Sequence, residues 1–173
     1  MNKLDGLELL LAERDIRTSM GRYCRGVDRA DAEILASAYW PDAFDDHVAW
    51  QGKASDLVPW LVGAMHGFNV SFHMIGQSNI VFRSPTEAEV ETYFINYLSP
   101  KRAAQGSSDI FQCGRYLDLF TRRDREWRIA HRNVVTDAMR DIGPAPDPTK
   151  PLSGAVWPRG SLGPDDPSYR IGS

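Results

Sequence analysis

The sequence has few cysteines, no long apolar run and no excess of either charge. Its two cysteines, Cys24 and Cys113, lie far apart and belong to no CxxC pair, so neither a zinc site nor a redox dithiol is indicated. No apolar stretch approaches the roughly 20 residues that span a bilayer, and acidic residues flank the short apolar stretch near the N-terminus, unlike a signal peptide. With 20 basic and 23 acidic residues, the chain lacks the basic excess of nucleic-acid-binding proteins. We therefore expect a cytoplasmic protein with reduced thiols and with no nucleic-acid or membrane partner.

Common catalytic motifs are also missing. The chain has no glycine-rich phosphate loop, no GxSxG and no HExxH, and Gly63, Gly67 and Gly76 do not form a dinucleotide fingerprint. Its histidines and carboxylates show no metal-ligand spacing. We therefore expect neither a metal nor an organic cofactor.

The 173 residues suffice for one ordinary domain, and composition changes near Asp141. Seven of the 11 prolines lie in the last 33 residues, which excludes long helices and central strands there. We place one domain at residues 1–140 and a Pro/Gly-rich tail at residues 141–173. Apolar side chains of the tail could pack on the domain or on a neighbouring subunit, and they are Val156, Trp157, Leu162, Tyr169 and Ile171.

Helical periodicity marks the first part of the chain. Apolar residues from Leu7 to Val27 recur mostly at three- to five-residue steps, which predicts a long amphipathic helix. A short helix should follow at 31–39 and stop at Trp40-Pro41, before a strand at 44–50. A third helix should begin at a cap on Ser55 or Asp56.

From Val70 onward the apolar period changes to two, which predicts strands. The expected strand pieces cover residues 70–75, 80–82, 88–98, 109–120 and 127–136, with a loop at 99–108 and a hairpin at 121–126. Helices followed by consecutive strands indicate an α+β fold, an antiparallel sheet with helices on one face. If such a sheet is strongly curved, it encloses a pocket between its concave face and the helices.

The four histidines are the main candidates for acid–base chemistry. His47 follows Asp45 and Asp46, and His66 suits the C-terminal end of the third helix, which is a structural role. His73 lies on a strand and could face either the pocket or the core. His131 and Arg132 are adjacent on the last strand and should therefore point to opposite faces.

Asp28 stands just after the first helix, where a carboxylate opposes the helix dipole. It could cap the second helix, but Asp31 is at least as good a cap, which leaves Asp28 free for another task. Tyr23 lies five residues earlier, roughly 140° around the helix, and could either reach the same cavity mouth or pack in the core.

Several motifs in order resemble the SnoaL-like families of the nuclear-transport-factor-2-like superfamily, an α+β fold with a cone-shaped barrel. The resemblance covers about residues 5–137. The motifs that carry it are Tyr23-x4-Asp28, Tyr39-Trp40-Pro41-Asp42-Ala43, His73-Met74-Ile75-Gly76, Gly114-Arg115-Tyr116-Leu117 and Trp127-Arg128-Ile129-Ala130-His131-Arg132.

The resemblance implies site residues as well as a fold. In bile-acid dehydratases and hexachlorocyclohexane dehydrochlorinase, an aspartate ending the first helix orients a strand histidine that removes a proton from carbon. The matching residues here are Asp28 and His73. Tyr23 matches a tyrosine of the dehydratases and could protonate a leaving oxygen, where the dehydrochlorinase has a lysine. Arg132 matches an arginine of the dehydrochlorinase and could hold negative charge on an enolate or a leaving oxygen.

The resemblance thus favours a cofactor-free lyase of the dehydratase type, or an isomerase, that acts on a hydrophobic cyclic or aromatic small molecule. Aldehyde-releasing carbon–carbon cleavage could use the same pair. A non-catalytic binding or assembly module and the small subunit of a ring-hydroxylating dioxygenase remain open, since the fold hosts many functions. We also expect a homodimer or homotrimer. Aromatic residues expected to line the substrate pocket are Phe72, Phe94, Tyr97, Phe111 and Tyr116.

Overall fold

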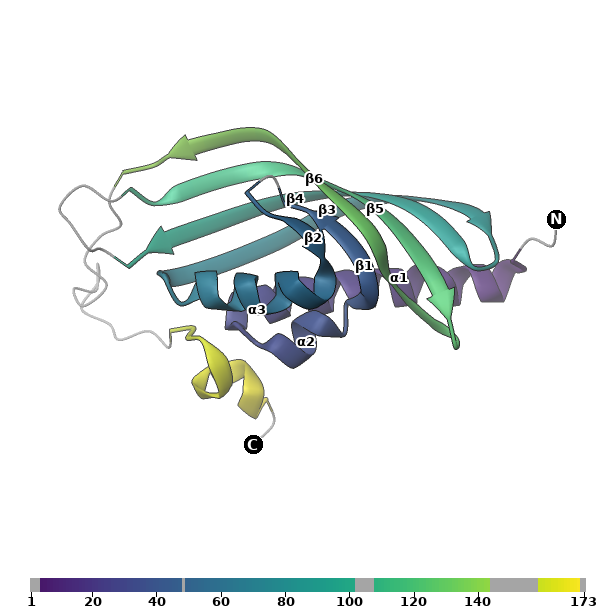
Figure 1. Cartoon of the computed structure of the whole chain (residues 1–173), viewed down its shortest axis with the longest axis horizontal. Helices are drawn as coiled ribbons and strands as arrows, with labels where there is room; N and C mark the ends of the chain where they lie inside the picture. The colour runs from purple at the N-terminus through teal and green to yellow at the C-terminus, as the bar shows by residue number, and fades with distance from the viewer. Residues whose placement is uncertain (1–3, 48, 102–107, 144–158, 172–173) are drawn as a thin grey trace.

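Three α-helices lie on one side of a curved six-stranded sheet that does not close into a barrel (Figure 1). This arrangement is that of a computed structural model, which describes residues 4–47, 49–101, 108–143 and 159–171. The expected α+β class, with the helices on one face of a curved sheet, is confirmed.

The first helix, α1 (Gly6–Arg29), follows from the apolar stripe of its sequence. Asp5 and Glu8 form a capping box at its start, and Ala30 ends it with a left-handed backbone at φ 50°. The stripe packs beneath the sheet, and its fully buried apolar side chains are Ile16, Met20, Tyr23 and Val27.

The second helix, α2 (Ala32–Ala36), begins at the predicted cap, because the Asp31 carboxylate accepts a hydrogen bond of 3.0 Å from the Ile34 amide. Gly26 lets α2 lie close to α1, since a Cβ at this position would meet the Leu35 backbone nitrogen at 2.5 Å. The helix is shorter than predicted because residues from Tyr39 onward enter the sheet.

The third helix, α3 (Ala54–Met65), starts before the two predicted caps, Ser55 and Asp56. Its N-cap residue is Lys53, which ends a strand and makes no side-chain capping bond. The chain passes directly from strand to helix, so the predicted caps fall inside the first turn.

The sheet order is β2-β1-β6-β5-β4-β3. All neighbouring strands are antiparallel except β1 and β6, which are parallel, so the sheet is mixed where the sequence predicted an antiparallel one. The strands are β1 (Tyr39–Asp46), β2 (Gln51–Lys53), β3 (Phe68–Ser84), β4 (Glu87–Pro100), β5 (Ile110–Arg123) and β6 (Glu126–Asp141).

Several strands differ from the prediction in their extent. β1 ends at Asp46 instead of residue 50, β2 was not predicted, and β6 runs to Asp141 instead of residue 136. Pro41 lies inside β1 instead of stopping a helix, because the pairing with β6 shifts register between Tyr39 and Phe44 and needs no amide from the proline. The two predicted pieces at 70–75 and 80–82 form one long strand, β3, with a register shift between Ile75 and Ser78. A bulge thus bends β3 without ending it.

The concave face of the sheet forms the core together with α1. Along β4 and β5 the inward positions are buried, and Phe94 stacks on Tyr116 at 4.4 Å between ring centroids. Gly114 permits this packing, since a Cβ there would lie 2.0 Å from the Val135 carbonyl oxygen and 3.0 Å from the Phe94 ring.

The described part of the tail packs on the C-terminal end of α1 and includes the 3₁₀ helices η1 (Gly163–Asp165) and η2 (Pro167–Arg170). The Tyr169 hydroxyl donates a hydrogen bond to Asp31, and the Arg25 guanidinium lies 4.6 Å from the Tyr169 ring centre. Asp166 pairs with Arg29 at 3.2 Å. Val156 and Trp157, which were also expected to pack on the domain or on a neighbouring subunit, lie outside the described ranges.

Candidate active site

The last turn of α1 and the first half of β3 bring a carboxylate and an imidazole together. His73 Nδ1 lies 2.6 Å from Asp28 Oδ1, and both side chains are at most 10% exposed. Asp28 accepts two more hydrogen bonds, from Ser71 Oγ at 2.9 Å and from the backbone N–H of His73 at 2.8 Å. The structure thus joins the two residues that the resemblance pairs, and three donors fix the carboxylate.

Local sequence explains this convergence. Asp28 lies in the last turn of α1, and not after the helix as predicted. Because Asp31 caps α2, the Asp28 side chain is free to turn toward the sheet. Ser71 and His73 are two residues apart on β3 and therefore share one face of the strand. That face is turned toward α1.

The contacts also fix which nitrogen of His73 carries the proton. A carboxylate only accepts hydrogen bonds, so in the neutral imidazole Nδ1–H donates to Asp28 and the lone pair is on Nε2. Nε2 lies 3.5 Å from Asn96 Nδ2, and this amide also donates to Gln112 at 3.1 Å. Among the described residues Asn96 Oδ1 is buried without a partner. The pair therefore presents a basic nitrogen beside an unused acceptor.

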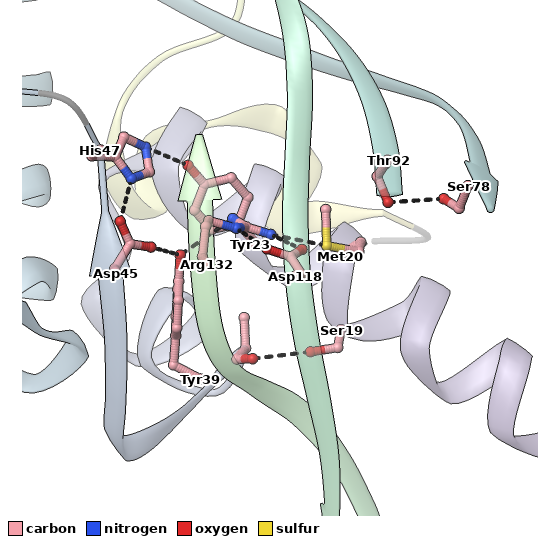
Figure 2. Close-up of polar contacts among 11 residues, drawn as sticks. Ser19, Met20, Tyr23, Tyr39, Asp45, His47, Ser78, Thr92, Asp118 and Arg132 are labelled. Carbon is pink, nitrogen blue, oxygen red and sulfur yellow. Dashed lines mark hydrogen bonds and ion pairs between the residues drawn. The ribbon is translucent and has the colours of Figure 1, made fainter. Parts of the chain in front are cut away.

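A second histidine–aspartate pair stands on β1 and just after it, and it contacts Tyr23 (Figure 2). His47 Nδ1 lies 2.6 Å from Asp45 Oδ1, and His47 Nε2 lies 3.1 Å from the Tyr23 hydroxyl. The Tyr39 hydroxyl donates to the other Asp45 oxygen at 2.7 Å. Tyr23, expected as a proton donor, is therefore linked to an imidazole of its own.

Arg132 is fully buried in the centre of this cluster (Figure 2). It makes a bidentate pair with Asp118, at 2.7 Å for both contacts, and donates to the Tyr39 hydroxyl at 3.2 Å. Its guanidinium carbon lies 4.1 Å from the ring centres of both Tyr23 and Tyr116. The Arg132 guanidinium thus lies against the Tyr23 ring. Its positive charge, which was expected to stabilise an oxyanion of the substrate, is already paired with the Asp118 carboxylate.

Burial and charge set the ionisation of this cluster. Burial raises the pKa of Tyr23 well above its ordinary value, and the Arg132 guanidinium opposes that rise only in part. Burial acts to raise the pKa of Asp45 as well, but the His47 hydrogen bond and the nearby charges bring that pKa below its ordinary value. Burial lowers the pKa of Arg132, yet the Asp118 carboxylate raises it overall. Tyr23 is therefore a neutral phenol beside an ionised Asp45.

The aromatic residues expected in the pocket divide between the two faces of the sheet. Phe94 and Tyr116 are buried on the concave face, with Tyr116 5.4 Å from Tyr23 between ring centres. Phe72, Tyr97 and Phe111 form one row across β3, β4 and β5, next to the row of His73 and therefore on the opposite face. Phe72 is 51% exposed there. These three do not line a pocket with His73, because an apolar row on a strand does not by itself reveal which face is inward.

Sequence reasoning missed the pairing of Asp45 with His47 and the contacts of Ser71 and Asn96. The second pair could have been found from the Asp45-x-His47 spacing, which places both side chains on one face of a strand. Ser71 stands at the same spacing before His73. Asn96 had no sequence signal, because only the pairing of β3 with β4 places it opposite His73.

No group of three or more His, Cys, Asp or Glu side chains among the described residues could hold a metal ion. No helix in that part of the chain combines the length and apolar character needed to cross a membrane.

A buried His–Asp pair beside a buried tyrosine, between helices and a curved sheet, defines a small α+β protein with acid–base groups on its concave side. Residues 8–133 match the family model of the SnoaL-like domain, which is most of the chain. The protein therefore belongs to the SnoaL-like domain family, as the motifs of its sequence indicate. No curated protein matches the chain.

Solved structures share the fold at low sequence identity. A protein assigned as a scytalone dehydratase from Novosphingobium aromaticivorans is 21% identical, with a TM-score of 0.70 over 86% of this chain and 98% of that one. The LinA-type3 hexachlorocyclohexane dehydrochlorinase from Novosphingobium barchaimii is 20% identical, with a TM-score of 0.71 over 83% and 100%. A protein assigned as an aromatic ring hydroxylase from Novosphingobium aromaticivorans is 14% identical, with a TM-score of 0.68 over 77% and 94%. Identities this low establish the nuclear-transport-factor-2-like fold alone.

Proposed function

We propose that the protein is a cofactor-independent lyase, or an isomerase, that acts on a hydrophobic cyclic or aromatic small molecule. The observation that carries the proposal is the contact of 2.6 Å between His73 Nδ1 and the buried Asp28 carboxylate. An imidazole held in this way is a general base suited to neutral pH, and the carboxylate stabilises the imidazolium that forms.

In the proposed reaction, His73 Nε2 removes a proton from a substrate carbon. The electron pair of the broken C–H bond forms a double bond or an enolate. Loss of an oxygen leaving group, protonated by Tyr23, gives the lyase reaction, whereas return of the proton to another carbon gives the isomerase reaction. If His73 instead takes a hydroxyl proton, the same pair starts an aldehyde-releasing carbon–carbon cleavage.

Arg132 has an indirect part in this scheme. Because its guanidinium is paired with Asp118 and lies on the Tyr23 ring, its charge stabilises electron density that develops on the Tyr23 oxygen. Arg132 is thus assigned to Tyr23 rather than to the substrate itself.

The proposed substrate class rests on two supports. Phe94 and Tyr116 present buried aromatic surface close to Tyr23. The structural neighbours include proteins described as acting on scytalone and on hexachlorocyclohexane. We therefore take a ring-bearing, largely apolar molecule as the substrate.

The proposal includes assembly into a homodimer or homotrimer in the cytoplasm. Large apolar side chains on the convex face of the sheet are exposed and suit a subunit interface, among them Phe72, Met74, Tyr93 and Leu117. Light scattering at micromolar concentration should give two or three times the chain mass, and a monomer mass would contradict this part of the proposal.

The test of the reaction uses scytalone and hexachlorocyclohexane as probes. Product formation is followed by NMR in D₂O, which also records deuterium entering the substrate carbon. The wild-type protein should act on at least one probe, and His73→Ala should slow it roughly 10²–10⁴-fold. His131→Ala is the control, because His131 stacks on Phe44 at 5.5 Å while Arg132, its neighbour on β6, is buried in the core. Tight binding of a probe without turnover or exchange would instead show a binding module.

A further inference from the structure

The pair formed by Asp45 and His47 has no part in the proton abstraction by His73. It nevertheless contacts the proposed proton donor directly, because His47 Nε2 lies 3.1 Å from the Tyr23 hydroxyl. Strand order places β3 at one edge of the sheet and β1 next to the opposite edge strand, β2, with α1 packed beneath the sheet. Tyr23 therefore has one histidine near it from each half of the sheet, with ring centres 6.3 Å away for His47 and 6.4 Å away for His73.

A buried tyrosine is a poor acid when it acts alone. Burial raises the pKa of Tyr23 well above its ordinary value, so a tyrosinate in this position is strongly disfavoured. A proton given to a leaving group must therefore be replaced in the same event. The Tyr116 hydroxyl donates a hydrogen bond to the Tyr23 oxygen, but burial raises the pKa of this phenol as well. The other neighbour of the Tyr23 hydroxyl is His47 Nε2, at 3.1 Å (Figure 2), and we take it as the proton source.

The relay begins with His47 as an imidazolium, and the charged groups around it can pair with that charge. Asp45 is an ionised partner at 2.6 Å, and Arg132 is already neutralised by Asp118. With His47 as imidazolium, the two acidic and two basic groups of the buried cluster balance, whereas a neutral His47 would leave one net negative charge. A buried charge is stable when it is paired and hydrogen bonded.

The protonation state of His47 also decides where the Tyr23 proton points. If His47 is neutral, Nδ1–H donates to Asp45, Nε2 accepts, and the Tyr23 hydroxyl donates to His47. If His47 is an imidazolium, Nε2–H donates to the Tyr23 oxygen instead. The phenolic proton is then free to point toward a bound substrate.

We propose that Asp45, His47 and Tyr23 form a proton relay, in which His47 supplies the proton that Tyr23 delivers to the departing oxygen of the substrate. This inference rests on the proposed function. As the C–O bond breaks, its electron pair stays on oxygen, which takes the Tyr23 proton while the Tyr23 oxygen takes the Nε2 proton of His47. His73 gains one proton from carbon and His47 loses one, so water is released and the protein keeps its total charge. Proton transfer from His73 to His47 through solvent restores the starting state.

In this relay His47 is a positioning and proton-supplying residue that acts through Tyr23. The relay is needed only when the leaving group must be protonated. Chloride is a stable anion and leaves without a proton, whereas hydroxide is a poor leaving group. The relay therefore predicts a dependence on the leaving group that a purely structural role for His47 does not.

The test compares loss of water from scytalone with loss of chloride from hexachlorocyclohexane in four variants. His47→Gln should slow loss of water roughly 10²–10³-fold and change loss of chloride less than about threefold, because glutamine can still donate to Asp45 but cannot supply a proton. Tyr23→Phe should slow loss of water to a similar extent. The double variant should be little slower than either single variant, since both residues serve one proton transfer. His131→Gln is the matched control and should change neither rate.

The outcomes separate the relay from the proposed function. Equal slowing of both reactions by His47→Gln would show a structural role and overturn the relay. Unchanged loss of water in His47→Gln, with His73→Ala inactive, would overturn the relay and keep the general base. No turnover of either probe by the wild-type protein would overturn both. If only scytalone is turned over, deuterium exchange at its carbon replaces chloride loss as the reaction that should persist in His47→Gln.

¹⁵N NMR adds a check on the protein without substrate. A neutral His47 with its proton on Nε2 would contradict the hydrogen bond from Nδ1–H to Asp45, on which the relay depends.

Discussion

Replacing Asp28 with asparagine changes one oxygen to a nitrogen and conflicts with a set of donors that all point at this side chain. Three hydrogen bonds converge on Asp28, from Ser71 Oγ, from the His73 amide and from His73 Nδ1. An amide group accepts with its oxygen only, and its nitrogen donates. Asp28→Asn must therefore place a donor against one of the three donors.

Each orientation of the asparagine has a definite cost. If its oxygen keeps Ser71 and His73 Nδ1, its nitrogen meets the His73 amide, which was bound at 2.8 Å. If it is turned around, its nitrogen meets His73 Nδ1 and drives the imidazole proton to Nε2, where it blocks the basic lone pair. The first orientation loses a buried hydrogen bond to a charged group, about 1.5–3 kcal/mol of unfolding free energy. The second orientation removes the base, and an amide also cannot stabilise the imidazolium. Turnover should therefore fall roughly 10²–10⁴-fold.

The assay combines turnover of a probe with urea unfolding. Asp109→Asn is the matched control, because Asp109 is also a buried carboxylate and accepts hydrogen bonds from the Tyr97 and Ser99 hydroxyls. It should lose a similar amount of stability and keep its turnover within about threefold. An Asp28→Asn protein that is destabilised but keeps full turnover would show that Asp28 only anchors β3 to α1, and it would refute the reasoning.

Three further predictions concern the cluster, the helix contact and the tail. Arg132→Met leaves the buried Asp118 carboxylate without its partner and should lower the unfolding free energy by about 3–5 kcal/mol. Adding Asp118→Leu removes that unpaired charge and should recover part of the lost free energy. Urea unfolding that shows no difference between the single and the double variant would contradict this. Gly26→Ala should lower the unfolding free energy by about 1–3 kcal/mol, because a Cβ at this position overlaps the backbone of α2. An unchanged melting temperature would disprove this prediction. Burial opposes ionisation of Asp166, but hydrogen bonds such as that from the Ser168 amide lower its pKa to about 2. Because this folded pKa is below the unfolded value of about 3.9, ionised Asp166 should stabilise the docked tail above pH 4, and the tail should loosen as pH falls toward 2. Proteolysis of the tail that is equally slow at pH 5 and pH 2 would contradict this prediction.

The fold class was readable from the sequence, because helical and strand periods are local. The stripe on α1 and the alternation on β4 directly report which residues the core buries. Pairing between distant strands is not local, and this is why the parallel contact of β1 with β6 and the position of Pro41 within β1 were not predicted. The register of that contact depends on how the whole sheet curves.

The site was predictable in part for the same reason. Asp28 could be singled out because Asp31 is the better cap, and the resemblance named His73. The inward or outward direction of Phe72 depends on one residue of register, which apolar composition does not encode. The bond between His47 and Tyr23 joins β1 to α1 across the core, and only the packed structure sets that distance.

The docking of the tail has a practical consequence for handling the protein. Tyr169 and Asp166 hold the turn of α1 that contains Arg25, Asp28 and Arg29, and the Arg29 side chain donates to the Asp28 carbonyl at 3.0 Å. A bulky affinity tag or fused domain after residue 171 would pull on this turn. The chain's N-terminus lies at the far end of α1 (Figure 1), so tags, surface attachment and labels belong there in any assay of this protein.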